Sequence, residues 1–101
     1  MSVPAEHPHH RLNELIHSPV RFSVMAALAG AESLDFKDLL DTIQVSDSLL
    51  SKQLAVLEKA GYVKIRKSFA GKMPRTSASL TPHGHEAWTG HLQTLREIAG
   101  G

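Results

Sequence analysis

The sequence predicts a mainly α domain of the α+β class, with three core helices, a small sheet of two or three strands and a final helix. Three observations predict this fold. Helix start and stop signals recur along the chain, apolar residues follow a helical period up to residue 60, and the period then changes to alternation. The length of 101 residues, 42% of them hydrophobic, suits one domain with a modest core.

Each of the three predicted core helices follows a residue whose side-chain oxygen can cap it, namely Ser18, Asp35 and Ser46. The helices are expected over about residues 19–29, 36–43 and 47–60. Apolar residues recur in each segment at the three- and four-residue spacing that places them on one helix face. Gly61 stands where a left-handed residue would end the third helix.

The segment after these helices predicts a β-hairpin. Val63, Ile65 and, less cleanly, Phe69 alternate with polar residues, which indicates a half-buried strand. Residues 70–74 contain glycine and proline without any period, so we expect a loop there and a second strand after it. Thr81-Pro82 then repeats the combination of cap and proline, which predicts a last helix that runs nearly to the C-terminus.

The N-terminal part of the chain carries weaker signals. Residues 1–10 are predicted to be a disordered tail, and a short helix is expected around Leu12, Leu15 and Ile16. Residues 11–101 therefore form the single predicted domain.

Charge is distributed unevenly along the chain, although its net value is only +1. Residues 31–47 carry five acids and one base, a net charge of −4. Residues 48–80 carry one acid and seven bases, which are Lys52, Lys59, Lys64, Arg66, Lys67, Lys72 and Arg75. Phosphate would be drawn to this second region, which covers the third helix and the hairpin.

Several classes of protein are disfavoured. The chain has no cysteine, which excludes disulfides, thiolate metal sites and thiol nucleophiles. The segment His85-Glu86 has Thr89 where a zinc-protease helix needs its second histidine, and Gly71-Lys72 precedes Met73 where a phosphate-binding loop needs Ser or Thr. We therefore expect no catalysis and no cofactor. No apolar run approaches the roughly 18 residues of a membrane span, so a cytoplasmic protein without a membrane partner is expected.

Seven histidines raise the alternative of a metal site. Two groups form in the sequence, and their members are His7, His9 and His10, then His83, His85 and His91. His83 and His85 would point about 200° apart on a helix, so they cannot face one ion without ligands from another subunit. We expect no metal.

Residues 45–63, VSDSLLSKQLAVLEKAGYV, and the following KIRKSFAGKMPRTSASLTPHG resemble the recognition helix, wing and next helix start of winged helix-turn-helix transcriptional regulators of the MarR and ArsR type. The specific marks are SxxSKQLxxLEKAGYV, the basic hairpin, and LTPHG where those families commonly have LT, two variable residues and G. The resemblance covers about residues 20–85 and is strongest toward small single-domain members. It implies a winged-helix DNA-binding domain.

Two departures from the family pattern matter. Many MarR-type wings carry an Asp before the wing arginine, whereas this chain has Met73-Pro74 before Arg75. ArsR-type metal sites usually involve cysteines, which this chain lacks. Metal sensing of that type is therefore not expected.

A helix that enters the major groove needs small or polar side chains outside and apolar ones inside, and the helix predicted over 47–60 has both. We expect its DNA contacts to come from Ser48, Ser51, Lys52 and, if it faces the groove, Gln53. In the hairpin, contacts with the DNA backbone or minor groove are expected from Lys64, Arg66, Lys67, Lys72 and Arg75.

One domain offers one recognition helix, whereas regulators of this kind typically bind pseudo-palindromic sites through two. We therefore expect a homodimer. Apolar residues near both chain ends exceed what a small core needs, and the expected dimer contacts are Leu12, Leu15, Ile16, Trp88, Leu92, Leu95 and Ile98. The alternative is that Trp88 and Leu92 only cover the core of one chain.

Together these observations predict a sequence-specific transcriptional regulator, most simply a repressor, that binds double-stranded DNA. A small-molecule effector would have to bind at the dimer cleft, since the chain has no room for a separate sensing domain. The alternative function is a winged-helix module that docks an acidic protein through its basic face.

Overall fold

The computed structural model describes residues 6–100 and confirms the mainly α fold with a small antiparallel sheet. Its elements are a 3-10 helix η1 (Pro8–Arg11), α1 (Pro19–Ala29), β1 (Leu34–Asp35), α2 (Phe36–Ile43), α3 (Asp47–Lys59), β2 (Val63–Ala70), β3 (Met73–Leu80) and α4 (Pro82–Ile98). The three strands pair in the order β1-β3-β2. The three core helices begin where predicted and end within one residue of the predicted positions.

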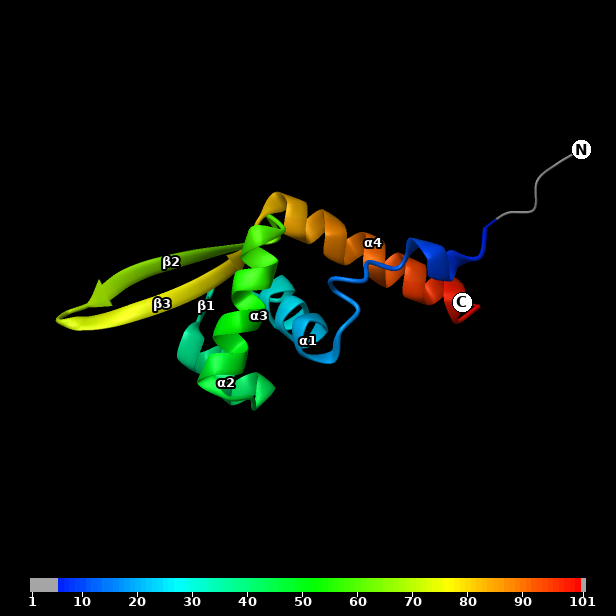
Figure 1. Cartoon of the computed structure of the whole chain (residues 1–101). Helices are drawn as coiled ribbons and strands as arrows, with labels where there is room; N and C mark the ends of the chain where they lie inside the picture. The colour runs from blue at the N-terminus through cyan, green and yellow to red at the C-terminus, as the bar shows by residue number, and fades with distance from the viewer. Residues whose placement is uncertain (1–5, 101) are drawn as a thin grey trace, which may run out of the picture.

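The molecule is elongated, with extents of 67 × 24 × 21 Å. Figure 1 shows the reason: α1, α2 and α3 form a central body, the β2–β3 hairpin extends to one side, and α4 extends to the other. The radius of gyration is 15.9 Å, compared with about 13 Å for a compact domain of this length. Both ends of the long axis are therefore available for contacts outside the chain.

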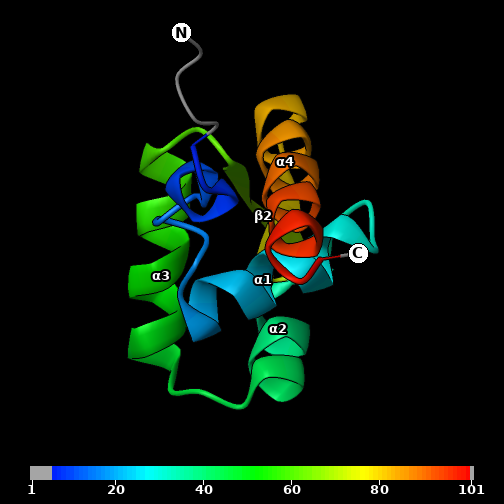
Figure 2. The same ribbon diagram turned by 90° about the vertical axis from the view of Figure 1, so that its right-hand side faces the viewer.

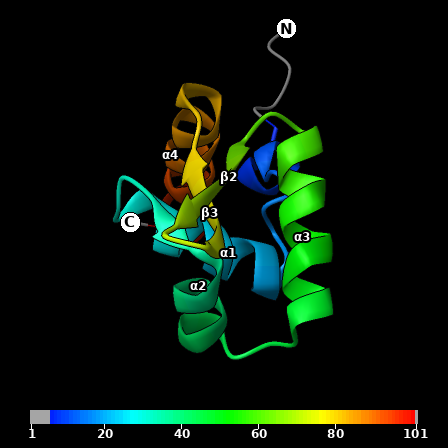
Figure 3. The same ribbon diagram turned by 90° about the vertical axis from the view of Figure 1, so that its left-hand side faces the viewer.

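The core lies where α1 meets the other helices. Figures 2 and 3 show α3 and α4 on opposite sides of the molecule, with α1 between them. Fully buried leucines from three helices meet there, among them Leu28, Leu39, Leu50 and Leu57. Val63 and Leu80 close the core from the base of the hairpin. Helix periodicity thus turns one face of each helix inward and leaves the outer face of α3 exposed.

Two of the predicted caps form and two do not. The Ser46 hydroxyl accepts a hydrogen bond from the Leu49 amide at 3.2 Å, and the Thr81 hydroxyl accepts one from Gly84 at 2.9 Å. Ser18 and Asp35 occupy N-cap positions, but their side chains make no capping hydrogen bond. The prediction that Asp35 caps α2 was wrong, because its carboxylate pairs with a side chain of the hairpin instead.

The hairpin is longer than predicted. Residues 70, 73 and 74 belong to the strands, and the turn contains only Gly71 and Lys72. Gly71 has φ +64°, which suits the first central position of a type II′ turn. Pro74 is tolerated because it pairs with Phe69, one residue from the closing pair, where the backbone nitrogen points away from β2. On the other side of β3, β1 pairs only with Ser77 and Ala78. The backbone nitrogen of Pro74 therefore faces an open edge of the sheet.

The short helix predicted around Leu12–Ile16 was wrong. These residues form a turn, because the Asn13 side-chain oxygen accepts the amide hydrogens of Leu15 and Ile16 at 3.0 and 3.1 Å. Such local side-chain bonds compete with helix formation. Within the predicted disordered tail, residues 1–5 lie outside the described part of the chain, whereas Pro8–Arg11 form η1 beside the end of α4.

Candidate nucleic-acid interface

Helices α2 and α3 form a helix-turn-helix pair. Gln44 ends α2 in the left-handed conformation, with φ +60°, and its amide donates to the Leu40 carbonyl at 2.8 Å. Two residues later Ser46 caps α3. This tight connection fixes the direction of α3 relative to the body, and Gln44 adopts there a left-handed conformation that is uncommon for a residue other than glycine.

The predicted contact residues on α3 divide into two groups. Ser48, Ser51 and Lys52 are exposed on the outer face. Gln53 is turned toward α1, where its side-chain oxygen accepts a hydrogen bond from Arg21 Nη1 at 2.7 Å. The condition attached to Gln53, that it face the groove, is therefore not met. Arg21 has no signal in the sequence that would have indicated this role.

All five predicted cations of the hairpin are exposed, namely Lys64, Arg66, Lys67, Lys72 and Arg75. Strand alternation divides them between two faces. Lys64 and Arg66 pair with Ser79 and Ser77 on one face. Lys67 pairs with Thr76 on the opposite face.

A groove of about 300 Å³ joins the outer face of α3 to the hairpin. Its lining includes Ser51 from α3 together with Lys67 and Thr76 from the hairpin. Two residues predicted from separate segments of the sequence therefore border one continuous surface. Phe36, Leu54 and Ile65 line the same groove, so it combines apolar side chains with hydroxyls and with the cation Lys67, which suits a phosphate backbone.

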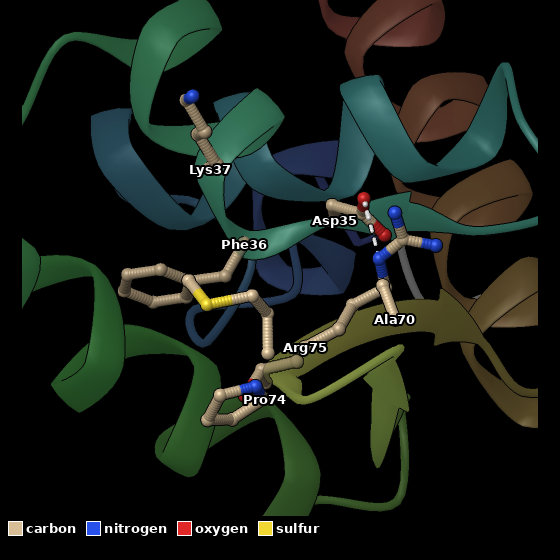
Figure 4. A pocket seen from close by; sticks show the side chains of 8 residues that line it. Asp35, Phe36, Lys37, Ala70, Pro74 and Arg75 are labelled. Atoms are coloured by element: carbon tan, nitrogen blue, oxygen red, sulfur yellow. Dashed lines mark ion pairs between the residues drawn. The ribbon is translucent and has the colours of Figure 1, made fainter.

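Arg75 is not a free cation. Its Nε lies 3.3 Å from Asp35 Oδ2 at the start of α2, and Figure 4 shows the side chain reaching across from β3. The two residues also border a hollow of about 380 Å³ between α2 and the hairpin. This ion pair braces the hairpin against the body from outside, where the resembling wings often carry an Asp within the wing itself.

The LTPHG segment forms a corner between the hairpin and α4. The Thr81 amide donates to the Tyr62 carbonyl at 3.0 Å, and the Thr81 hydroxyl donates to the Gly61 carbonyl at 2.5 Å. Gly84 lies directly against the same backbone, because a Cβ atom placed on it would be 2.0 Å from the Tyr62 oxygen. The glycine of this motif is therefore required by a close backbone approach.

The residues predicted for dimer contacts fall into two groups, one in the core and one outside it. Ile16 is completely buried in the core of its own chain, and Leu15 and Trp88 pack against that core. Trp88 contacts Phe22, with ring centroids 4.9 Å apart. By contrast, four predicted residues lie outside the core cluster as it is formed by residues 6–100, and these are Leu12, Leu92, Leu95 and Ile98.

His91 joins the N-terminal segment to α4. Its side chain is 2% exposed, and its Nδ1 accepts a hydrogen bond from the Asn13 amide at 3.2 Å. Its Nε2 has no partner among the described residues. Burial, and then the nearby His17, lower the pKa of His91 below its usual value, so this histidine is neutral at pH 7.

Two features are absent from residues 6–100. No three side chains of histidine, cysteine, aspartate or glutamate are grouped so that they could hold a metal ion. No helix in this part of the chain is long and apolar enough to cross a membrane.

Sequence reasoning gave no role to the most exposed large apolar residues. Phe69 and Met73 flank the hairpin turn and are 74% and 70% exposed. The one signal available was that Phe69 fitted the strand alternation less well than Val63 and Ile65.

The arrangement is that of a winged helix-turn-helix, and comparison with known proteins gives the family. The winged helix DNA-binding domain family matches residues 20–99. The chain therefore belongs to this family, whose members bind DNA and are not enzymes.

Individual proteins from other organisms are similar to this chain. An uncharacterized protein of Methanocaldococcus jannaschii is 26% identical over 86 residues, which span 85% of this chain and 94% of that protein. A transcriptional regulator homologue from Pyrococcus horikoshii OT3 superimposes with a TM-score of 0.82, at 26% identity and 87% coverage of both chains. A structure from Enterococcus faecalis V583 that is assigned to the MarR family of transcriptional regulators shares the fold, with a TM-score of 0.72, 23% identity, and coverage of 86% and 77%.

Proposed function

We propose that this chain is a sequence-specific transcriptional regulator that binds double-stranded DNA in the cytoplasm. In this proposal α3 enters the major groove and the β2–β3 hairpin contacts the adjacent backbone or minor groove. The observation that carries it is the groove between Ser51 and Lys67, which places the outer face of α3 and the cationic hairpin on one surface. The family assignment supports DNA as the partner.

The individual contacts follow from side-chain chemistry. Ser48, Ser51 and Lys52 can reach base edges or phosphates, since they lie on the exposed face of α3. Lys64, Arg66, Lys67 and Lys72 supply attraction that does not depend on sequence. Arg75 contributes less charge to the DNA, because Asp35 already faces it.

The proposed functional unit is a homodimer, which would present two recognition helices about one DNA turn, or roughly 34 Å, apart. Leu92, Leu95 and Ile98 follow each other at three-residue steps on the part of α4 that extends from the body, and Leu12 lies in the N-terminal segment. Their position outside the core supports a contact with a second copy. Ile16, Leu15 and Trp88 are assigned to the core of each chain instead.

An effector would bind near this same contact. A hollow of about 310 Å³ has mainly apolar walls, and the residues that line it include His17, Pro19, Phe22 and Leu95. Because Leu95 belongs to the proposed dimer surface, occupancy of the hollow could change how two copies meet. Promoter occupancy by the dimer would act most simply as repression.

Fluorescence anisotropy with the DNA upstream of the chain's own gene tests the proposal. The purified protein is titrated against that duplex and against a scrambled duplex, at two salt concentrations, with molar mass measured in parallel. We expect salt-sensitive binding that prefers the upstream duplex, with two chains for each site. Weak binding that ignores sequence would refute sequence-specific regulation and would favour the docking of an acidic protein.

A further inference from the structure

The tip of the hairpin carries bulky apolar side chains in water. Phe69 and Met73 are 74% and 70% exposed, whereas the other exposed large apolar residues, Leu49 and Ile98, reach only 37% and 38%. A single exposed apolar residue needs no explanation, but here two of them flank the same two-residue turn. The turn between β2 and β3 lies at one end of the long axis, away from the core (Figure 1).

Strand register places the two side chains on opposite faces of the hairpin. Phe69 pairs with Pro74 and shares its face with Lys67, which borders the groove beside α3. Met73 pairs with Ala70 and shares its face with Arg75. The tip is therefore an apolar wedge, defined by Phe69, Met73 and Pro74, with cations behind it and Lys72 at its turn.

The wedge lies beyond the three-stranded part of the sheet, and Met73 and Pro74 line the hollow of about 380 Å³ between the hairpin and α2. β1 pairs only with Ser77 and Ala78, so the five residues from Thr76 to Lys72 extend as a two-stranded ribbon. At about 3.3 Å per residue this ribbon reaches roughly 15 Å, which exceeds the minor groove depth of about 7.5 Å. The ion pair between Arg75 and Asp35 connects this ribbon to the body.

The chemistry of the tip selects its partner. An apolar wedge flanked by cations fits a site in which apolar surface lies between two rows of negative charge. Stacked base pairs between the phosphates of the minor groove form such a site. Proteins that insert Phe, Met or Pro between base steps there unstack the step partially and bend the duplex.

We propose that the wedge inserts Phe69 and Met73 into the minor groove beside the α3 contact, partially unstacks one base step and bends the DNA. This inference rests on the proposed DNA-binding function and adds a means of recognition that needs no base-edge hydrogen bond. Flexible pyrimidine–purine steps resist unstacking least, so the protein selects such a step at a fixed distance from the α3 contact.

Two fluorescence measurements on the full chain test the wedge. The upstream duplex carries 2-aminopurine at successive steps to report unstacking, and a separate duplex carries a donor and an acceptor at its ends to report bending. At saturating protein we expect increased 2-aminopurine emission at one step and a higher transfer efficiency. The double variant F69A/M73A should abolish both signals and weaken binding about tenfold, with an unchanged melting temperature because both side chains are exposed.

Lys72→Ala serves as the control at the same tip. It removes a cation but leaves the wedge, so it should keep both optical signals at saturation while flattening the salt dependence of binding. If F69A/M73A bends or unstacks the DNA as much as the wild type does, the proposed insertion of Phe69 and Met73 is refuted, while the DNA-binding function remains intact. Failure of the wild-type protein to bind the duplex at all would instead overturn the proposed function.

Binding of the tip to a lipid membrane instead of DNA would give a different result. Binding of the wild type, but not of F69A/M73A, to vesicles of anionic lipid, together with unchanged DNA bending in the variant, would assign the tip to a membrane surface. That result would also overturn the wedge.

Discussion

Replacing Gly84 by alanine tests the corner that joins the hairpin to α4. A Cβ atom on this residue would lie 2.0 Å from the Tyr62 carbonyl oxygen and 2.9 Å from its carbonyl carbon. Ordinary contact begins near 3.4 Å, so backbone must move by more than 1 Å, and both the oxygen and the helix are held by hydrogen bonds. The perturbation therefore acts on rigid neighbours.

The cost follows from two opposing contributions. Overpacking against structure that cannot yield destabilises by about 1–3 kcal/mol, occasionally more, and moving α4 also loosens the capping bond from the Gly84 amide. Alanine recovers at most about 1 kcal/mol of helix propensity. We expect a net loss of about 2–3 kcal/mol, which lowers the melting temperature of a chain this size by roughly 10 °C or more.

Gly90→Ala is the matched control on the same helix. A Cβ at Gly90 would meet nothing within 4 Å, so only the propensity gain of about 0.8–1 kcal/mol remains. Thermal and urea denaturation followed by circular dichroism should show opposite shifts for the two variants. A Gly84→Ala protein as stable as the wild type would refute the argument that backbone contact dictates this glycine.

Three further predictions concern binding, acidity and assembly. Lys72→Ala should flatten the slope of log affinity against log salt concentration by about 0.9 for every DNA sequence. Ser51→Ala should in addition change the preference among DNA sequences, and both effects are measured in anisotropy titrations. Identical effects of the two variants would contradict the roles assigned to these residues. Burial and the nearby His17 lower the pKa of His91 in the folded protein, so the unfolded chain binds a proton at this histidine at higher pH than the folded chain does. The melting temperature should therefore fall as the pH drops below about 6.5. His91→Gln should reduce this fall, and the same pH profile in the variant would contradict the role of His91. Leu95→Glu should convert the proposed dimer to monomer in light scattering, and an unaltered molar mass would remove α4 from the interface.

The core helices could be predicted from sequence because their signals are local. Ser46 caps α3 as expected, and the inward leucines set its period. The turn and strands of the hairpin were harder, since Pro74 usually marks a loop. It fits into β3 here only because its pairing position needs no amide hydrogen, a property of register that composition does not show.

The candidate site was predictable in its composition but not in its pairings. Exposed cations and serines lie where charge and periodicity placed them. The bond from Arg21 to Gln53 and the ion pair between Asp35 and Arg75 join residues 32 and 40 positions apart. Each depends on how helices and strands pack, so no local pattern indicates it, and each removes charge or polarity that the sequence had assigned to DNA.

The corner at Thr81 and Gly84 sets the direction in which α4 leaves the hairpin. With 17 residues, this helix is about 25 Å long, so a tilt of about 10° at its first turn displaces its far end by roughly 4 Å. The corner is fixed by main-chain atoms and one threonine hydroxyl, whereas the far end of the helix carries Leu95 and Ile98. In the proposed dimer, a small molecule bound beside the distal half of α4 would need to move this end only slightly to change the distance between the two recognition helices relative to the pitch of B-form DNA.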